Sequence, residues 1–355
     1  MRIRLNHQAL KAAGDTKAKL TVLKGQVAFI LTMGEVSKAM MGQHRLSNIK
    51  SLNAHVAVES LNESTIKSFL AQKFNVPTDN PKLVNYTNQY VQFIHENMLE
   101  LDFGYEALFK HVDMVGSMQD YFEINSAKMK AAWNVRAPGE KTQLRTAVTE
   151  DGLQVKMIEM SDGIQLLDRW LEYNQFYKIE GALSEFYNTY YQKKAEFHYG
   201  LFTNLGAEVD FDVSGHADDV IALNAASGAM DRSLEGKGLP GGVNAGKSIL
   251  VAPEYQGKVG KMLSATLDSE LVKQGTVVEP LTARINQVVS STKVPKSKNG
   301  YYLIQHGGRI QKADWKPLTT ESGRDILVSA EQLVGVGQYN CAVGDTDQVL
   351  FVPFK

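Results

Sequence analysis

The strongest constraint in this sequence is an alternating segment that leads into a long aromatic-rich helix. From Lys141 to Met160, apolar and polar side chains alternate on both sides of the dipeptide Asp151-Gly152. A period of two sends successive side chains to opposite faces of a strand, and Asp-Gly supplies the positive φ that a tight hairpin turn requires. The pattern predicts a two-stranded ribbon. Because two strands alone are marginal in water, we expect this ribbon to pack on another subunit.

The segment after the ribbon predicts an amphipathic helix from about Phe176 to Phe202. At 1.5 Å per residue this helix is roughly 42 Å long, and Gly181 is its weakest position, costing about 1 kcal/mol relative to alanine. Residues 166–173 fit either the end of the ribbon or an earlier helical turn. We expect the aromatic residues to fill a core or an interface rather than to bind a cofactor. The apolar residues at steps of three and four are Ile179, Leu183, Phe186, Tyr187, Tyr190, Tyr191 and Phe197.

The composition is that of an ordinary globular protein. The chain has 355 residues, of which 43% are hydrophobic and 22% charged, so it can form two or three subdomains with cores of their own. Its net charge is −1, from 38 basic and 39 acidic residues, so no global basic field recruits nucleic acid. The single cysteine, Cys341, excludes an intrachain disulfide and is expected to be a buried filler.

The sequence predicts neither a membrane span nor a secretory signal. The longest apolar run, residues 27–33, is far below the ~18 residues that a crossing helix needs. The N-terminal segment is basic, but it lacks an adjoining hydrophobic stretch and a small-residue cleavage site. We therefore expect a protein that is made in the cytoplasm and does not associate with a membrane.

The remaining segments mix helices and strands in an irregular order. Residues 1–75 predict short helices whose narrow apolar stripe has to lie on another surface. Helices are also predicted at residues 81–101, 218–230 and 257–271, and strands at ILVAPEY, TARINQVVSSTKVP, GYYLIQ, DILVSAEQLVGVG and DQVLFVPF. This order favours the α+β class over a regular winding of strand, helix and parallel strand.

One nucleotide-binding motif matches formally. The segment from Gly241 to Ser248 fits the pattern G-x-x-x-x-G-K-[ST], which binds phosphate when a strand precedes it and a helix follows it. Here SLEGKGLPG precedes the motif and the strand-like ILVAPEY follows it, so the context is inverted. We interpret the motif as a flexible glycine-rich surface loop.

No other pattern predicts catalysis or metal binding. The segment from Asp210 begins like a calcium-binding loop, but its twelfth position is Ile221 where a bidentate glutamate is needed. Ser214, Asp218 and Asp219 are instead expected to cap the next helix and to complement its dipole. The eight histidines are scattered, with no H-x-x-x-H pair. We therefore predict no catalytic residue, cofactor or metal.

Taken in order, these elements resemble the major capsid protein of tailed bacteriophages, whose shell fold is shared with encapsulins and herpesvirus capsid floors. The resemblance covers nearly the whole chain. The segments SSTKVPKSKNGYYLIQHGGRI and DILVSAEQLVGVGQYNCAVGDTDQVLFV are similar to the closing strands of Mu-like major head subunits. The resemblance implies an N-terminal arm (1–75), the start of a peripheral domain (76–127), an extended loop (128–160), a peripheral domain with a spine helix (161–204), an axial domain (205–322) and return strands (323–355).

The implied function is structural and not enzymatic. A capsid protein of this family assembles into hexamers and pentamers that form an icosahedral shell around phage DNA, and it resides in the virion. Its partners are other copies of itself, scaffolding, portal and decoration proteins, and the packaged DNA by non-specific proximity. The arm and the ribbon suit contacts between subunits because neither can bury its own apolar face. A tube- or ring-forming phage assembly protein and a phosphate-loop nucleotide hydrolase are the alternatives.

Two groups of residues carry the implied contacts. The loop near the axes of hexamers and pentamers is expected to include Gly241, Gly242, Asn244 and Lys247. The candidate contacts between subunits are Trp133, Val135, Arg136, Asp151, Gly152 and Leu153.

Overall fold

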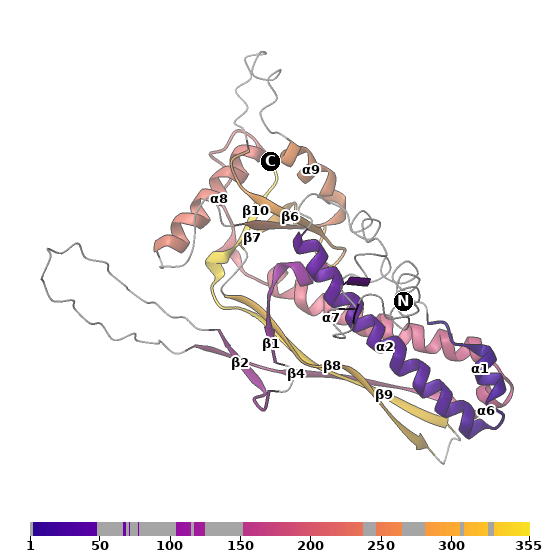
Figure 1. The fold of residues 1–355 in the computed structure, drawn as a ribbon. Coiled ribbons are helices and arrows are strands. Elements are labelled where there is room, and N and C mark those ends of the chain that lie inside the picture. Colours follow the sequence, from indigo (N-terminus) through magenta and orange to yellow (C-terminus); the bar gives the residue numbers. More distant parts are fainter. Residues whose placement is uncertain are drawn as a thin grey trace, which may run out of the picture. The chain divides into compact units, whose positions relative to one another are not determined.

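The described residues of this computed structural model form two compact units, coloured along the sequence in Figure 1. The structure describes residues 3–47, 67–68, 71, 77, 104–114, 117–124, 152–236, 246–264, 281–305, 309–325 and 330–355, and the side chains within these ranges except at 32–47 and 324–325. Unit 1 comprises residues 1–107, 158–198 and 314–339, and unit 2 comprises residues 108–157, 199–313 and 340–355.

The N-terminal segment forms two helices, α1 (His7–Ala12) and α2 (Thr16–Ser47). The side chain of Asn6 caps α1 by accepting a hydrogen bond from Ala9 N at 3.0 Å, and that of Asp15 caps α2 by accepting from Ala18 N at 2.7 Å. The prediction of short helices was wrong here, because α2 is 32 residues long. No proline interrupts it, and its apolar residues keep a helical spacing that tertiary packing can stabilise.

The apolar stripe of α2 is buried within its own unit. Leu23, Val27 and Leu31 are at most 7% exposed and pack in one cluster with side chains of the aromatic-rich helix. The Lys19 ammonium donates to Leu171 O at 3.2 Å and to Asn174 Oδ1 at 3.0 Å, which fixes the start of α2. The described part of the arm therefore covers its stripe without a second subunit, contrary to the expectation.

The predicted aromatic-rich helix is confirmed as α7 (Phe176–Thr203). Its residues Phe176, Ile179, Leu183 and Tyr187 are at most 1% exposed and belong to the core of unit 1. Residues 166–173 combine the two predicted structures, because strand β4 (Ile158–Leu167) ends inside this segment and the short helix α6 (Asp168–Glu172) follows at once.

A four-stranded sheet has the order β1-β8-β9-β4. Strands β4 and β9 are antiparallel, with Cα partners from Ile158↔Tyr339 to Leu167↔Ala330. Strand β8 was not predicted; it contains Pro317 and many charged residues, which obscure its alternation. The bounds not yet given are β1 (Lys110–Asp113), β8 (Ile310–Asp325) and β9 (Ala330–Val343).

Unit 2 contains a mixed sheet of order β10-β7-β5-β6, in which the pair β5–β6 is parallel and the pairs β10–β7 and β5–β7 are antiparallel. Helix α8 supplies Leu223, Ala226 and Met230 to a core that it shares with this sheet. The α+β class is thereby confirmed. The elements are α8 (Asp219–Gly236), β5 (Lys247–Val251), α9 (Gln256–Ser264), β6 (Ile285–Ser290), β7 (Gly300–Gln305) and β10 (Val349–Pro353), with short 3-10 turns η1 (Gly104–Leu108), η2 (Ala207–Val209), η3 (Pro253–Tyr255) and η4 (Thr346–Gln348).

The helix predicted at residues 218–230 is confirmed and is longer than expected. Asp218 caps α8, because its Oδ1 accepts hydrogen bonds from Val220 N at 2.9 Å and Ile221 N at 2.8 Å. The helix predicted at residues 81–101 and the second half of that predicted at 257–271 lie outside the described residues.

Cys341 is buried, as predicted, with 5% of its surface exposed. Among the helices that the structure describes, none is both long enough and apolar enough to cross a membrane.

Candidate functional site

The base of the predicted ribbon is a two-stranded antiparallel pair in unit 2, β2 (Tyr121–Ile124) with β3 (Leu153–Lys156). The return strand is where the alternation placed it. β3 pairs with β2, which comes before residues 128–148. Those residues, where we expect the outward strand, lie outside the described part of the chain. The sequence Tyr-Phe-Glu-Ile of β2 alternates as well and has high strand propensity, but it is too short to stand out.

One face of this strand pair is largely buried, but at the end next to the insertion one of its side chains is exposed to solvent. Phe122 and Val155, which are Cα partners, are 4% and 7% exposed. Ile124 is also buried, whereas its partner Leu153 is 49% exposed. Gly152 is half-buried. The other candidate contacts, Trp133, Val135, Arg136 and Asp151, lie outside the described residues.

Lys247 is not a surface-loop residue, which corrects the prediction for this part of the glycine-rich motif. It is the first residue of β5 and only 1% exposed, and its Nζ donates to both carboxylate oxygens of Asp231 at 2.8 and 2.9 Å. The sequence could not show that α8 brings a carboxylate to this point. The other three candidate loop residues, Gly241, Gly242 and Asn244, lie outside the described residues.

The same geometry contradicts a phosphate-binding role for the motif. Lys247 and Ser248 are the first two residues of strand β5, at the point where a phosphate-binding loop continues into a helix whose N-terminus faces the phosphate. The ammonium group of Lys247 is bound by Asp231 instead. In the described part of the motif, this arrangement counts against the nucleotide hydrolase alternative.

The calcium-like segment is a turn that leads to α8. Asp212 Oδ1 accepts a hydrogen bond from Ser214 N at 2.9 Å, and this bond lowers the pKa of the exposed Asp212 carboxyl. Within the part of the chain that the structure describes, no three His, Cys, Asp or Glu side chains are placed to hold a metal ion.

A buried charged cluster in unit 1 joins α7 to the strands. Lys194 Nζ lies 2.5 Å from Asp314 Oδ1 and 4.5 Å from the centroid of the Tyr339 ring. His198 donates from Nδ1 to Lys194 O at 2.7 Å and stacks on Tyr105 at a centroid distance of 4.3 Å. Because Lys194 and His198 are at most 2% exposed, substrate has no access to them and the cluster stabilises the core.

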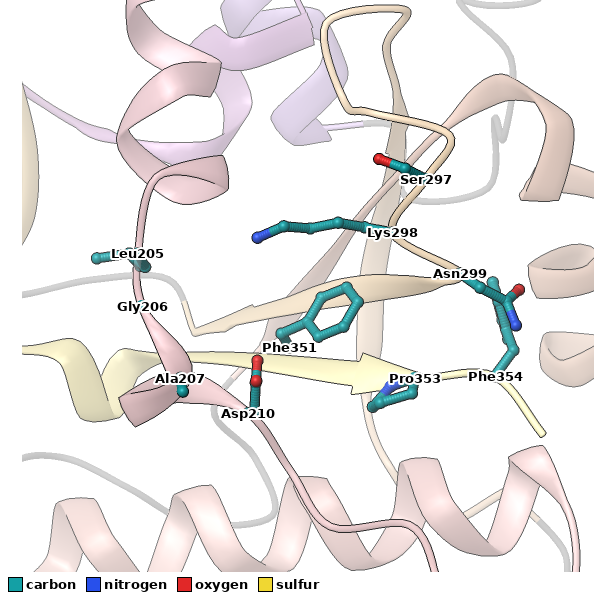
Figure 2. A pocket seen from close by; sticks show the side chains of 10 residues that line it. All are labelled: Leu205, Gly206, Ala207, Asp210, Ser297, Lys298, Asn299, Phe351, Pro353 and Phe354. Carbon is teal, nitrogen blue, oxygen red and sulfur yellow. The ribbon is translucent and has the colours of Figure 1, made fainter.

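A cavity of about 490 Å³ lies beside β10 in unit 2. We call it the β10 pocket; it is lined by residues 205–207 and Asp210 after α7, residues 297–299 before β7, and Phe351, Pro353 and Phe354. Figure 2 shows the Lys298 side chain extending past the Phe351 ring toward Leu205.

Comparison with known proteins gives structural likeness alone. No family model matches the sequence, and no curated protein matches it. The chain is similar to the mature capsid protein of bacteriophage PhiM1, with 13% identity, 70% of this chain and 86% of that chain covered, and a TM-score of 0.43. It is also similar to a virus-like particle from Pyrococcus furiosus, with 7% identity and a TM-score of 0.42. That match covers 69% of this chain and 89% of the other chain.

A third structure is the procapsid of satellite phage P4 with its size determination protein, at 7% identity, 74% and 90% coverage and a TM-score of 0.42. A likeness to Mu-like head subunits stays a prediction. The solved structures to which the chain is similar are mostly capsid proteins of phages.

Proposed function

We propose that this chain is the major capsid protein of a tailed phage, a structural subunit that assembles into hexamers and pentamers of an icosahedral shell. The observation that carries the proposal is the ribbon base. Ile124 and Leu153 are Cα partners, and the chain places residues 125–152 between them. A hairpin needs only two to five residues to connect such partners. The insertion is long enough to act as a contact with another subunit, as the resemblance implies for an extended loop.

The distribution of charged and apolar side chains supports this role. Buried charges are paired within the chain, as in the ion pairs Lys194–Asp314, Lys247–Asp231 and Arg309–Asp345. Several large apolar side chains are nevertheless exposed, and exposed apolar surface is typical of protein contact sites. These residues include Met118, Leu153, Tyr173 and Tyr177.

The proposal extends to partners and location. The main partner is a second copy of the chain, since identical subunits on closed symmetry repeat the same contacts. Scaffolding, portal and decoration proteins, and packaged double-stranded DNA by non-specific proximity, complete the set. The protein is made in the host cytoplasm and resides in the virion.

A shortened ribbon tests the proposal. Residues 125–152 are replaced by Asn-Gly, which can join the paired residues Ile124 and Leu153 as a two-residue turn. We expect a soluble subunit with an unchanged unfolding transition that no longer forms particles in negative-stain microscopy. The triple variant Trp133→Ala, Val135→Ala and Arg136→Ala keeps the full length of the ribbon. It tests whether the candidate contact side chains, rather than the length of the ribbon, are needed for assembly. Normal shells from the shortened chain would contradict the proposal, and open tubes or rings from the wild type would favour the tube-forming alternative.

A further inference from the structure

The turn before the ribbon presents a fully exposed methionine. Met118 is 101% exposed, the largest value among the exposed large hydrophobic residues. Its turn, residues 117–120, which we call the Met118 turn, is held by backbone hydrogen bonds from Ser117 N to Met114 O at 3.0 Å and from Met157 N to Asp120 O at 2.7 Å. Gln119 N also donates to Ser117 Oγ at 3.1 Å. An apolar side chain on so well-bonded a turn is pre-organised for binding, because little conformational freedom is lost.

The β10 pocket offers a surface that suits a methionine. Its walls include the aromatic rings of Phe351 and Phe354 together with Pro353 and Leu205. Thioether sulfur makes favourable contacts with aromatic rings, and the unbranched methionine side chain adapts to irregular cavities. The pocket and the Met118 turn both lie in unit 2, and in a single chain the methionine is outside the pocket.

The pocket also carries a positive charge, the ammonium group of Lys298. Lys298 Nζ donates to Thr203 O at 3.1 Å and to Tyr302 Oη at 2.8 Å, and lies 5.5 Å from the centroid of the Phe351 ring. It makes no ion pair with any residue that the structure describes. A lysine ammonium has three donor hydrogens, so one remains for an incoming acceptor.

The Met118 turn supplies the matching negative charge. Asp120 is exposed, and its carboxylate makes no ion pair within the described part of the chain. Met118 and Asp120 are two residues apart, so their Cα atoms are separated by at most about 7 Å. The Met118 turn can therefore place Met118 against the apolar wall of the β10 pocket and, at the same time, the Asp120 carboxylate next to Lys298.

We propose that the Met118 turn of one copy binds in the β10 pocket of a neighbouring copy, with Met118 against Phe351 and Asp120 paired with Lys298. The occupant is a second copy because the turn and the pocket are complementary and both are accessible on the same chain. Such a contact is heterologous: the two surfaces differ, so repetition closes a ring or continues as an open array. The inference rests on the proposed function, for which it names one contact.

Paired substitutions test the apolar part of the contact. Met118→Glu should weaken self-association roughly tenfold or more, because burial of a methionine side chain is lost. The matched control is Gln119→Glu, which adds the same charge at the adjacent exposed position and should leave self-association unchanged. Sedimentation velocity over a concentration series gives the association constants. Equal effects of the two variants would overturn the inference.

A charge exchange tests the ionic part. Asp120→Lys and Lys298→Glu should each weaken association, and the double variant should recover most of the loss. Because Lys298 also bonds to Thr203 and Tyr302, the thermal unfolding of each variant is measured in parallel. Failure of the folded double variant to recover association would count against the pairing.

Crosslinking gives a readout that does not depend on folding changes. Gln119→Cys and Ala207→Cys alter exposed side chains and keep Met118, and the native Cys341 is buried. A mixture of the two variants, treated with a short bismaleimide after assembly, should give crosslinked dimers that wild type alone does not give. Particles without this crosslink would overturn the inference and leave the proposed function standing. A wild type that forms no particle at any concentration would overturn both.

Discussion

Lys247 and Asp231 form a two-pronged ion pair in which the lysine Nζ lies 2.8 and 2.9 Å from the two carboxylate oxygens. The pair joins β5 to α8 within unit 2. The side chains of Lys247 and Asp231 are 1% and 15% exposed, so most of the water that would solvate them is excluded. Removal of one partner leaves the other charge poorly solvated.

Lys247→Ala should therefore lower the free energy of unfolding by about 3 kcal/mol, the loss typical of a broken buried ion pair. Lys258→Ala is the control, since Lys258 pairs with Asp219 at 3.1 Å but is 37% exposed. Its loss should cost less than about 1 kcal/mol. Urea denaturation measures both, and equal losses would mean that burial of Lys247 does not strengthen the pair.

Gly335 on β9 packs against α7 so closely that a side chain cannot be added without rearrangement. A Cβ at this position would lie 2.7 Å from Phe186 Cζ and 3.3 Å from Leu318 Cδ1. Gly335→Ala should lower the free energy of unfolding by about 1–3 kcal/mol through overpacking. Gly323→Ala, where a Cβ meets nothing within 4 Å, should change it by less than about 0.5 kcal/mol. An unchanged midpoint for Gly335→Ala would show that the sheet and helix separate easily.

Gly181 lies away from the ends of α7 and is exposed to solvent, and a Cβ at this position would meet nothing within 4 Å. Gly181→Ala should raise the free energy of unfolding by about 1 kcal/mol, because alanine has the higher helix propensity. The midpoint of urea denaturation should rise accordingly. A decrease would indicate that this face of the helix contacts part of the chain outside the described residues.

Two buried tyrosines predict a loss of stability at alkaline pH. Burial raises the pKa of Tyr187 and of Tyr301 well above the usual tyrosine value of about 10. Above this usual value the unfolded chain releases the phenol protons while the folded chain keeps them, so stability falls as pH rises. At pH values below this usual pKa, both states keep the phenol protons and the stability is not reduced. Urea midpoints measured from pH 8 to 11 should fall at the alkaline end, and less so in Tyr187→Phe. A slope identical in Tyr187→Phe and wild type would exclude Tyr187 as a source.

Local periodicity predicted the elements whose pattern is long or uninterrupted. α7 matches the predicted helix because no proline interrupts its aromatic stripe, and β7 matches GYYLIQ residue by residue. The prediction for β8 failed because Pro317 and its charged neighbours break the alternation, while β9 stabilises the strand from outside the segment.

Long-range partners account for the other differences. The burial of Lys247 depends on Asp231, and the closure of the ribbon base depends on β2, and neither partner can be identified from the local pattern. The β10 pocket likewise combines residues after α7, before β7 and within β10, which only the tertiary fold brings together. Nothing in the sequence indicates that Met118 is a contact residue, because single exposed apolar side chains are common on protein surfaces.

The size of the purified wild-type protein tests the central claim most directly. If the chain is a shell subunit, size exclusion with light scattering and negative-stain microscopy should show capsomers of five or six copies or closed particles of megadalton mass. The balance should shift with salt and pH, because a net charge of −1 gives little mutual repulsion. A protein that stays monomeric at high concentration, alone and with its neighbouring phage proteins, would contradict the claim.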